Sequence, residues 1–311
     1  MLSVLAGGVG AARFLVGLVD VVPAEQVTVV VNTADDDEFH GLWVSPDLDS
    51  VTYRLAGAHN PETGWGLADE SFRAIDALAR YGVPTWVRLG DRDLATHLYR
   101  TERRRAGATL SEITGEITRA WDVRARLLPM TDDRVATRIR VEGPAGVEDL
   151  AMQQWFVERR AEPPVVDVRF DGADRARPAP GVLESLAAAD TIVICPSNPI
   201  ISIGPILAVP GIRELLVERR DRVVGISPIV AGRPVRGPAD RLMGPLGLEV
   251  SSAGVATAYR DFCATLVIDR VDRDLVPAIE GMGVRAVTTD TVMRDATVAA
   301  ALARETLAAV A

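Results

Sequence analysis

The sequence contains no lysine, so all 34 of its basic residues are arginine. Without a lysine amine the chain cannot form a Schiff base, which excludes pyridoxal-phosphate chemistry, and it cannot build the lysine-dependent P-loop. Its formal net charge is −9, and no basic tract interrupts this acidic balance. Because nucleic-acid binding depends on neutralising phosphates, we expect no nucleic acid among its partners.

Cysteine, histidine and long apolar runs are also scarce. Cys195 and Cys263 lie far apart and outside any metal-ligand spacing, which argues against a disulfide framework and a structural zinc site. The 3 histidines are too scattered for a zinc or iron signature. No apolar run approaches the roughly 18 residues that span a bilayer, and no positively charged signal-peptide start is present. We therefore expect a soluble, cytoplasmic protein that does not contact a membrane.

Short β-branched runs alternate with helical patterns along the 311 residues, which is typical of a parallel sheet covered on both faces. Strands are predicted at Leu2–Leu5, Val27–Val31, Thr85–Leu89, Thr191–Cys195, Val223–Ile226, Thr265–Ile268 and Ala286–Thr288. Helices are predicted at Ala11–Val22, Glu70–Tyr81, Leu94–Arg105, Val182–Ala189, Pro210–Arg220, Ala253–Phe262 and Ala296–Val310. This order predicts an α/β fold with a doubly wound, mostly parallel, Rossmann-like sheet.

The alternation breaks between residues 110 and 172. Thr109 and Glu112 predict a capping box that opens one more helix, and two β-like pieces follow at Val135–Val141 and Val165–Phe170. We therefore predict a discontinuous Rossmann-like core, residues 1–109 and 173–311, that carries residues 110–172 as a smaller inserted helical and β lobe.

A glycine-rich turn, Gly7-Gly8-Val9-Gly10, follows the first predicted strand and opens a helix. Glycines let the backbone approach a ligand, and the free N–H groups of a helix N-terminus bind phosphate. A dinucleotide fingerprint would have glycine in place of Arg13 and an acidic residue in place of Asn32. Gly7, Gly8 and Gly10 therefore predict phosphate or nucleotide contact rather than NAD binding, with a plain strand–helix turn as the alternative.

Carboxylates gather after the second predicted strand. Asp36 belongs to the acidic run of residues 35–38, and Asp47 and Asp49 follow Pro46. Clustered carboxylates at a sheet edge are costly unless they bind a cation or face water. A partly extended segment would point Asp47 and Asp49 into one cavity. A metal site and a solvated acidic loop therefore both remain open.

Two further polar segments stand where strands are predicted to end. The Arg88 guanidinium can grip a phosphate or an acidic ring, although an N-capping Asp91 with surface ion pairs explains the same segment. Ser197 and Asn198, in a proline-flanked turn, suit either nucleotide contact or simple turn formation. All these loops meet at one edge only if the sheet is parallel, and this convergence is stronger than any single motif.

In their order along the chain, these segments resemble the 2-phospho-L-lactate transferase family (CofD in archaea, FbiA in actinobacteria), which builds coenzyme F-420. The resemblance extends from Val4 to about Met293. The motifs that carry it are Gly7-Gly8-Val9-Gly10, Val30-Val31-Asn32 with Asp36, Pro46-Asp47-Leu48-Asp49, Gly90-Asp91-Arg92-Asp93-Leu94-Ala95-Thr96-His97, Leu128-Pro129-Met130-Thr131-Asp132-Asp133, Pro196-Ser197-Asn198-Pro199-Ile200-Ile201-Ser202-Ile203-Gly204-Pro205-Ile206 and Ser227-Pro228-Ile229-Val230.

The resemblance implies a transferase that uses two small-molecule substrates. The donor would be a guanosine diphospho-linked lactyl, enolpyruvyl or glyceryl acid. The acceptor would be 7,8-didemethyl-8-hydroxy-5-deazariboflavin (Fo), whose terminal ribityl hydroxyl attacks phosphorus while GMP leaves. The resemblance also implies Mg²⁺ as cofactor and a homodimer.

The resemblance assigns residues to these partners. Asp49 and Arg88 match the family's Fo contacts. The positions that match its nucleotide side are Gly7, Gly8, Gly10, Ser197 and Asn198. An alcohol is a poor nucleophile, so we expect Asp49 to accept its proton during the attack. We expect Asp47 and Asp36 to hold the metal.

Two other functions remain to be weighed. A non-catalytic regulator that binds a nucleotide sugar would share the Rossmann-like core and the glycine loop. It would lack the pairing of the Pro46–Asp49 segment with Arg88. An NAD(P)-dependent oxidoreductase is disfavoured by Arg13 and Asn32.

Overall fold

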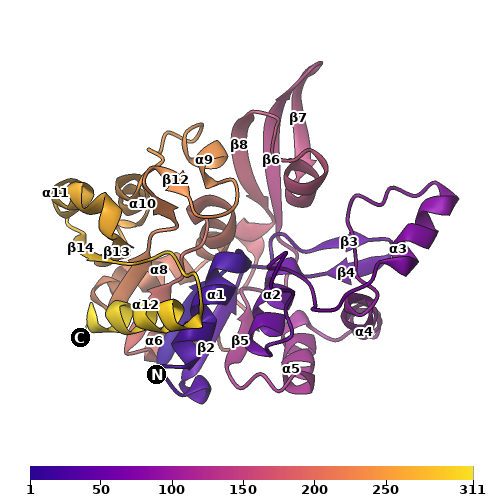
Figure 1. Cartoon of the computed structure of the whole chain (residues 1–311), viewed down its shortest axis with the longest axis horizontal. Helices are drawn as coiled ribbons and strands as arrows, with labels where there is room; N and C mark the ends of the chain where they lie inside the picture. Colours follow the sequence, from indigo (N-terminus) through magenta and orange to yellow (C-terminus); the bar gives the residue numbers. More distant parts are fainter. Residues whose placement is uncertain (311) are drawn as a thin grey trace.

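A seven-stranded parallel sheet forms the centre of the computed structural model, which describes residues 1–310 (Figure 1). Its strands lie in the order β14-β13-β10-β9-β1-β2-β5. Their bounds are β1 Leu2–Ala6, β2 Val27–Val31, β5 Arg126–Pro129, β9 Thr191–Ile194, β10 Val223–Ile226, β13 Thr265–Asp269 and β14 Arg285–Thr289. These strands consist largely of apolar, β-branched residues, and their side chains are buried on both faces of the sheet, as is typical of a parallel sheet covered by helices on both sides. The predicted α/β fold class is confirmed.

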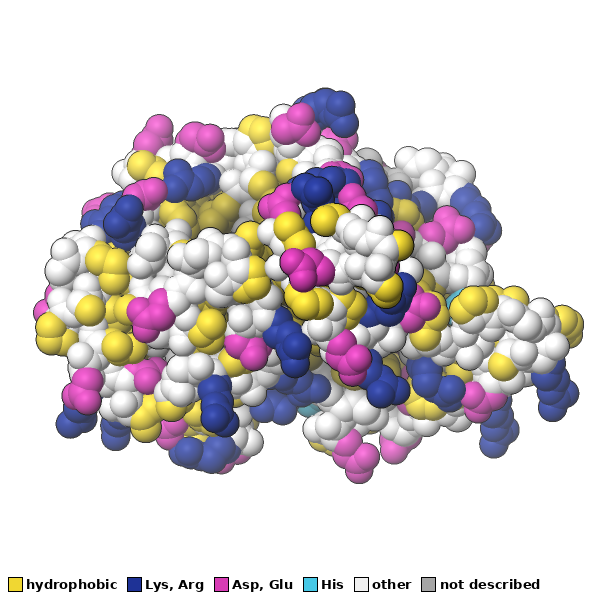
Figure 2. All heavy atoms as spheres, turned by 90° about the horizontal axis from the view of Figure 1, so that it is seen from above, with side chains coloured by type: hydrophobic (Ala, Val, Ile, Leu, Met, Phe, Trp, Pro, Cys, Tyr) yellow, Lys and Arg dark blue, Asp and Glu magenta, His cyan; other side chains and the backbone are white. Residues whose placement is uncertain are grey.

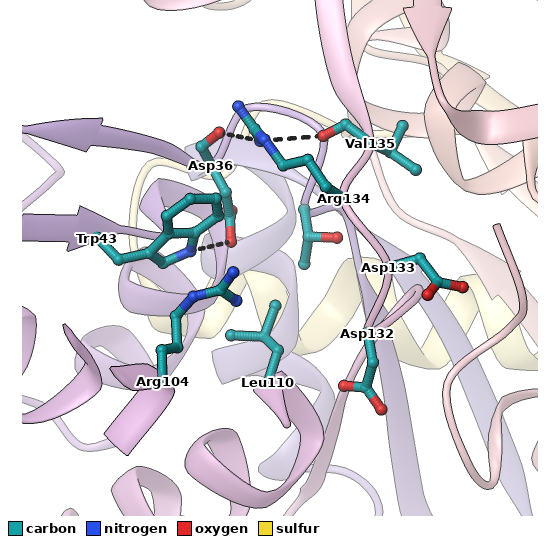
Figure 3. A pocket seen from close by; sticks show the side chains of 9 residues that line it. Asp36, Trp43, Arg104, Leu110, Asp132, Asp133, Arg134 and Val135 are labelled. Atoms are coloured by element: carbon teal, nitrogen blue, oxygen red, sulfur yellow. Dashed lines mark hydrogen bonds between the residues drawn. The ribbon is translucent and has the colours of Figure 1, made fainter. Parts of the chain in front are cut away.

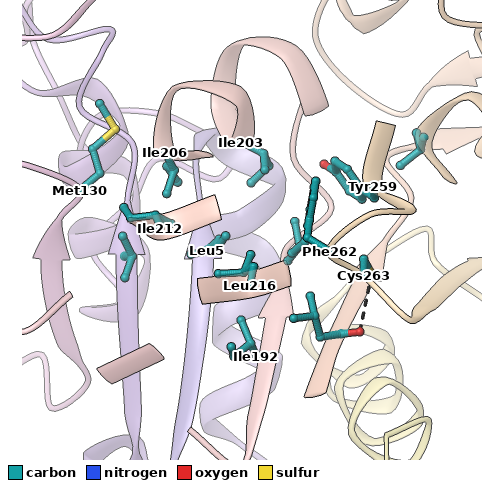
Figure 4. Close-up of a cluster of buried hydrophobic side chains, with 14 of the residues drawn as sticks. Leu5, Met130, Ile192, Ile203, Ile206, Ile212, Leu216, Tyr259, Phe262 and Cys263 are labelled. Carbon is teal, nitrogen blue, oxygen red and sulfur yellow. Dashed lines mark hydrogen bonds between the residues drawn. The ribbon is translucent and has the colours of Figure 1, made fainter. Parts of the chain in front are cut away.

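Helices cover the two faces in separate sets. One face packs against α1 Gly8–Val19, α2 Pro46–Leu55, α5 Leu110–Ala120 and α12 Ala296–Ala308. The opposite face packs against α6 Val182–Ala188, α7 Gly204–Ala208, α8 Ile212–Glu218, α9 Ala239–Met243, α10 Ser252–Tyr259 and α11 Val276–Glu280. Figure 4 shows the second core, in which Leu5 and Ile192 of the sheet meet Ile212 and Leu216 of α8. Alternate strand residues supply the two cores because successive side chains point to opposite faces.

Strand β1 lies between β2 and β9, and the order of the strands reverses there: β2 and β5 are added on one side, and β9, β10, β13 and β14 on the other. Its register pairs Leu2 with Val27 on one side and Leu2 with Thr191 on the other. Strand β5, next to β2, ends at Pro129 opposite Val31. The loops after these strands therefore leave the sheet at one edge, as ligand-binding loops do at a topological switch point.

The predicted strand at Thr85–Leu89 is wrong. These residues form no strand and lie between α3 Arg73–Leu78 and α4 Asp93–Arg105. Their β-branched run is only half-buried, and Trp86 packs on Phe39 at 5.6 Å between ring centroids, away from the central sheet. The chain's third strand in the central sheet is β5, whose short leucine run carried no β-branched signal.

Residues 110–172 contain two different structures. The capping box of Thr109 and Glu112 opens α5 as predicted, and β5 then joins the central sheet. A separate antiparallel sheet follows in the order β7-β6-β8. Its strands, β6 Ala136–Gly143, β7 Gly146–Ala151 and β8 Val165–Asp171, rise from the body in Figure 1 and pack around the buried Trp155. The division of the chain into domains stays a prediction.

A second projection, called here the arm, consists of residues 37–92 without α2. It contains the hairpin β3 Asp37–Phe39 and β4 Leu42–Val44, followed by α3 and the 3₁₀ turn η2 Ala79–Tyr81 (Figure 1). Short elements complete the chain: η1 Ala24–Gln26, η3 Gln154–Glu158, η4 Ala173–Arg175, η5 Pro199–Ile203, η6 Arg220–Arg222, β11 Ile229–Val230, β12 Arg233–Pro234 and η7 Arg270–Leu275.

Arginine and carboxylate side chains are interspersed over the face seen in Figure 2. Several exposed ones form ion pairs, such as Arg213 with Asp261 at 2.8 Å. Within residues 1–310, no single helix combines the length and apolar character needed to cross a membrane. One helix pair bent by 93°, Pro199–Ala208 with Ile212–Glu218, meets the length and composition limits together.

Candidate active site

The loops after β1 and β9 touch at the switch point. Ser197 Oγ donates a 2.8 Å hydrogen bond to the carbonyl oxygen of Gly7. Asn32, directly after β2, donates from Nδ2 to the carbonyl oxygen of Ile201 at 3.3 Å. Three segments that are far apart in the sequence therefore meet at one edge of the sheet. The strands therefore bring together the loops after β1, β2 and β9, whereas the Arg88 segment follows no strand and is not among them.

The start of α1 requires glycine for two different reasons. Gly8 has a φ of +73°, in the left-handed region that side chains disfavour. A Cβ at Gly10 would lie 2.4 Å from the carbonyl oxygen of Pro196, so only glycine allows α1 to pack this closely on the β9 turn. Gly7 is equally enclosed, since its Cβ would meet that of Ser202 at 2.7 Å. The glycines thus hold the helix N-terminus against the switch point.

Asp47 is bound to this glycine turn. The backbone N–H of Gly8 donates to Asp47 Oδ1 at 2.8 Å, and Asn32 Nδ2 donates to Asp47 Oδ2 at 2.9 Å. Asp47 lies in the first turn of α2, where Pro46 begins the helix. Burial raises the pKa of Asp47 to about 6, despite these two hydrogen bonds. The backbone N–H group of Gly8 in the glycine turn therefore already donates to an acidic side chain, Asp47.

Two more buried carboxylates follow β2: Asp35 interacts with Asp47, whereas Asp36 interacts with Asp49 and Arg100. Asp35 Oδ2 accepts a 3.3 Å hydrogen bond from Asn32, and Asp36 Oδ2 accepts one of 2.6 Å from Ser45. The Oδ1 atoms of Asp35 and Asp36 are buried and accept no hydrogen bond from residues 1–310. Burial raises the pKa of Asp36 to about 7, and burial with the charge of Asp47 raises that of Asp35. Each carboxylate thus has an oxygen in need of a partner.

Asp49 faces a different direction from Asp47. The segment is helical rather than extended, and side chains two positions apart on a helix do not face each other. The expectation that both carboxylates point into one cavity is therefore wrong. Asp49 is only 5% exposed, and both its oxygens accept hydrogen bonds from the Arg100 guanidinium of α4, one at 3.1 Å.

Arg88 lies on the arm. Its Nη2 donates to Asp76 at 2.9 Å, and its guanidinium lies 4.8 Å from the centre of the Phe72 ring. The side chain is 45% exposed. No hydrogen bond or ion pair within residues 1–310 joins Arg88 to Asp49. The structure therefore does not place these two predicted Fo contacts against each other.

Asn198 has one partnered and one free side-chain atom. Its Oδ1 accepts from the backbone N–H of Ile200 at 2.9 Å and so caps the π-helical turn η5. Its Nδ2 is buried and makes no hydrogen bond with the described chain. The predicted turn chemistry is therefore present, and a donor remains beside the switch point.

A small pocket has Asp36 in its lining (Figure 3). Its lining residues are Thr33, Asp36, Trp43, Arg104, Leu110, Asp132, Asp133, Arg134 and Val135. The guanidinium of Arg104 stacks on Trp43 at 3.9 Å from the ring centre, and Trp43 Nε1 points to Asp36 at 3.3 Å. No local pattern in the sequence pointed to Trp43 or Arg104, because only the tertiary structure brings α4 against the β3–β4 hairpin.

Arg100 and His97 were likewise not identified as partners of Asp49. Asp93, His97 and Arg100 follow the spacing i, i+4, i+7, which places them on one face of α4. Polar residues at this spacing predict one polar face on the helix. The sequence does not say which element packs against that face, and the structure shows that it is α2.

The acidic cluster suits a hard divalent cation. Mg²⁺ is bound through oxygen atoms, usually one or two carboxylates together with substrate phosphates and water. In the described part of the chain, no three acidic, histidine or cysteine side chains already converge as ligands. The unpartnered oxygens of Asp35 and Asp36 nevertheless match the low protein-ligand count of a Mg²⁺ site.

Comparison with known proteins gives a consistent assignment. The family model for 2-phospho-L-lactate transferase CofD matches residues 2–306. A phosphoenolpyruvate transferase from Streptomyces griseus is 46% identical over 306 residues, which is 98% of this chain and 96% of that protein. One from Mycobacterium tuberculosis is 44% identical over 283 residues, 86% of each chain. A UPF0052-family structure from Bacillus halodurans shares the fold, with a TM-score of 0.63, 17% identity and 98% coverage of both chains.

Proposed function

The chain belongs to the 2-phospho-L-lactate transferase (CofD) family and is a transferase, and we propose that it transfers a phospho-three-carbon-acid group in coenzyme F-420 biosynthesis. The proposed donor is a guanosine diphospho-linked acid and the proposed acceptor is Fo. Among lactyl, enolpyruvyl and glyceryl donors we favour the enolpyruvyl one, because relatives at 46% and 44% identity are named phosphoenolpyruvate transferases.

The observation that carries this proposal is the anion site at the switch point. Gly8 N–H binds the Asp47 carboxylate at 2.8 Å, and Asn198 Nδ2, in the turn after β9, is buried with no partner among the described residues. Backbone N–H groups at a helix N-terminus bind phosphate in the same way. We propose that Gly7, Gly8, Gly10, Ser197 and Asn198 form the binding site for the diphosphate side of the donor.

The proposed reaction is a displacement at phosphorus. The terminal ribityl hydroxyl oxygen of Fo forms a bond to the phosphorus that carries the three-carbon acid. The bond from that phosphorus to the bridging oxygen breaks, and its electron pair leaves with GMP. The hydroxyl proton passes to a carboxylate, and we propose Asp49 for this role. Holding the reacting atoms in line lowers such a barrier by about 7–11 kcal/mol.

The carboxylate oxygens of Asp49 can accept a hydrogen bond from the Fo hydroxyl in addition to those from Arg100. Arg100 takes one lone pair on each carboxylate oxygen, and each oxygen has a second one. For the other proposed Fo contact, Arg88, half of the side chain is exposed and only one N–H group is used by Asp76. A guanidinium has five N–H donors, so the remaining ones are available to the acidic ring of Fo.

Mg²⁺ is the proposed cofactor, with Asp47 and Asp36 as its ligands. Asp36 offers an unpartnered Oδ1, and Asp47 lies at the anion site itself. When bound, the metal offsets charge on the phosphoryl oxygens by several kcal/mol. The contribution of the chain is to keep these carboxylates buried, where they gain most from a cation.

The test is a direct assay. Purified protein is incubated with Fo, Mg²⁺ and each of the three guanosine diphospho-linked donors, and products are identified by mass spectrometry. We expect a phosphodiester of Fo and one equivalent of GMP, fastest with the enolpyruvyl donor. Absence of product with all three donors would overturn the proposal. A UDP-sugar binding measurement is the control for the regulator function considered above.

We also propose that the enzyme is a homodimer, which light scattering of the purified protein tests by its mass against the 33.3 kDa of one chain. Cytoplasmic location, and the expectation of neither nucleic-acid nor membrane partners, stay predictions.

A further inference from the structure

A chain of buried polar side chains lies behind Asp49, and the proposed reaction assigns no role to it. Arg100 and His97, both on α4, are 2% and 1% exposed. His97 Nδ1 lies 3.3 Å from Arg100 Nη1, and His97 Nε2 lies 3.2 Å from Asp93 Oδ2. The Tyr53 hydroxyl, from α2, donates to Asp93 Oδ1 at 2.5 Å. We call Tyr53, Asp93, His97 and Arg100 the α4 network.

The chemistry of the partners determines where the protons lie. A guanidinium is always a donor, so His97 Nδ1 accepts from Arg100 and carries no proton. The ring proton is therefore on Nε2, which lies 3.2 Å from Asp93 Oδ2 without the geometry of a hydrogen bond. Asp93 is held in turn by Tyr53, which faces it from α2. Hydrogen bonds thus join Tyr53 to Asp93, His97 to Arg100 and Arg100 to Asp49, while Asp93 and His97 lie at ion-pair distance from each other.

A purely structural purpose explains this arrangement poorly. Apolar side chains of similar volume fill a buried space at least as well as ion pairs do, because charges lose their hydration on burial. Neighbouring arginines of the same helix show the usual alternative: Arg103 pairs with Glu116 at 2.7 Å on the surface, with 36% of its side chain exposed. What the buried network adds is a fixed orientation, which a reacting carboxylate needs.

We propose that the α4 network is a positioning device that fixes the carboxylate of Asp49 for the attacking hydroxyl of the acceptor. This inference rests on the proposed function. Arg100 holds both carboxylate oxygens in its planar fork, so the side chain cannot rotate, and the lone pairs left over point in a constant direction. His97 Nδ1 accepts from this fork and restrains it, and Asp93, which Tyr53 holds, lies 3.2 Å from the other ring nitrogen.

Two substitutions of His97 separate the contacts it makes. His97→Asn places an acceptor near the position of Nδ1 and keeps the contact to Arg100. His97→Gln reaches the position of Nε2 and keeps the contact to Asp93, but leaves Arg100 without its acceptor. If Arg100 must be oriented, we expect kcat to fall roughly 10–100-fold in His97→Gln and clearly less in His97→Asn.

Arg100→Lys tests the fork itself. Lysine keeps the positive charge but offers a point donor instead of two parallel ones. We expect kcat to fall by about 100-fold or more, with the KM for the guanosine donor unchanged, because the donor binds at the glycine turn. Arg103→Ala is the matched control on the same helix, since it removes the surface ion pair with Glu116 and should leave kcat unchanged.

Thermal unfolding is measured for every variant, and Tyr53→Phe is the mildest one, expected to lower kcat several-fold while retaining the fold. Wild-type kcat and KM in folded Arg100→Lys and His97→Gln would overturn the positioning role. Equal losses in His97→Asn and His97→Gln would overturn the orientation through Nδ1. No turnover by the wild-type enzyme would instead overturn the proposed function, and this inference with it.

Discussion

The backbone N–H of Gly8 donates a 2.8 Å hydrogen bond to Oδ1 of Asp47, a residue 39 positions away in the sequence. This contact joins the start of α1 to the start of α2, so an acidic side chain occupies the anion site of the glycine turn. A phosphate that binds there meets the Asp47 carboxylate. The site therefore suits a diphosphate that arrives together with a cation, and this relationship leads to the first prediction.

Asp47→Asn should make nucleotide binding less dependent on Mg²⁺. The amide oxygen still accepts from Gly8, but the negative charge is gone. We expect GDP to bind roughly tenfold more tightly than to the wild type when Mg²⁺ is absent, and to gain less when Mg²⁺ is added. Calorimetric titration with GDP measures both effects. Asp261→Asn, a surface change beside Arg213, is the control, and equal Mg²⁺ dependence in wild type and Asp47→Asn would contradict the prediction.

Asp36→Asn should change how stability depends on pH. Burial raises the pKa of Asp36 from 3.8 in its ordinary state to about 7 in the folded protein. Between these values the folded chain holds a proton that the unfolded chain has released, so the free energy of unfolding falls as pH rises. We expect it to fall by roughly 1–3 kcal/mol between pH 5 and 7.5 through Asp36, and Asp36→Asn to remove this part.

Urea unfolding at several pH values measures this slope. The matched control is Asp37→Asn, in the same acidic run, because Asp37 is half-exposed and pairs with Arg134 at 3.3 Å. The slope should persist in Asp37→Asn. A slope that is the same in wild type and Asp36→Asn would show that Asp36 does not hold the proton.

Gly10→Ala should destabilise the protein. The added methyl would lie 2.4 Å from the Pro196 carbonyl oxygen, and backbone atoms on both sides must shift. We expect a loss of roughly 1–3 kcal/mol together with weaker GDP binding. Gly115→Ala in α5 is the opposite case, since nothing lies within 4 Å of its Cβ, and it should gain about 0.5–1 kcal/mol. Chemical unfolding measures the free energy of unfolding of both variants. Equal stability of Gly10→Ala and the wild type would show that a methyl group fits beside the Pro196 carbonyl oxygen.

Asp49→Asn should lower both turnover and stability. The amide can accept only part of the Arg100 fork, and this guanidinium, 2% exposed, then lacks its ionic partner. We expect kcat to fall roughly 10²-fold or more, and the free energy of unfolding to fall by up to about 3 kcal/mol. Steady-state kinetics and urea unfolding test the two effects separately. Unchanged turnover in the folded variant would remove Asp49 from the reaction.

Ser197→Ala should weaken the junction between β1 and β9. The hydroxyl group is buried and satisfies the Gly7 carbonyl oxygen at 2.8 Å, which would be left without this donor. We expect a loss of about 1–3 kcal/mol in the free energy of unfolding. Ser111→Ala, whose hydroxyl contacts Asp132 away from the junction, is a control for GDP affinity. Equal GDP affinity in both variants would place Ser197 outside the nucleotide site.

By itself the sequence determined the parallel α/β architecture and the edge at which the polar loops meet. Buried parallel strands are short runs of β-branched residues, and the order of such runs with helical patterns leaves few topologies. The glycine turn, the Thr109–Glu112 capping box and the Ser197–Asn198 turn are also local features, so they could be predicted from neighbouring residues. Thr85–Leu89 shows the limit of this approach, because a β-branched run does not say whether a sheet exists beside it.

Only the tertiary structure decided which carboxylate does what. Asp47 and Asp49 are two positions apart, yet helix α2 turns one toward Gly8 and the other toward Arg100, which is 51 positions further along the chain. The same holds for Trp43 with Arg104 and for Tyr53 with Asp93. Direction and burial of a side chain depend on what packs against it, and the partners of these residues come from elements that no local pattern connects.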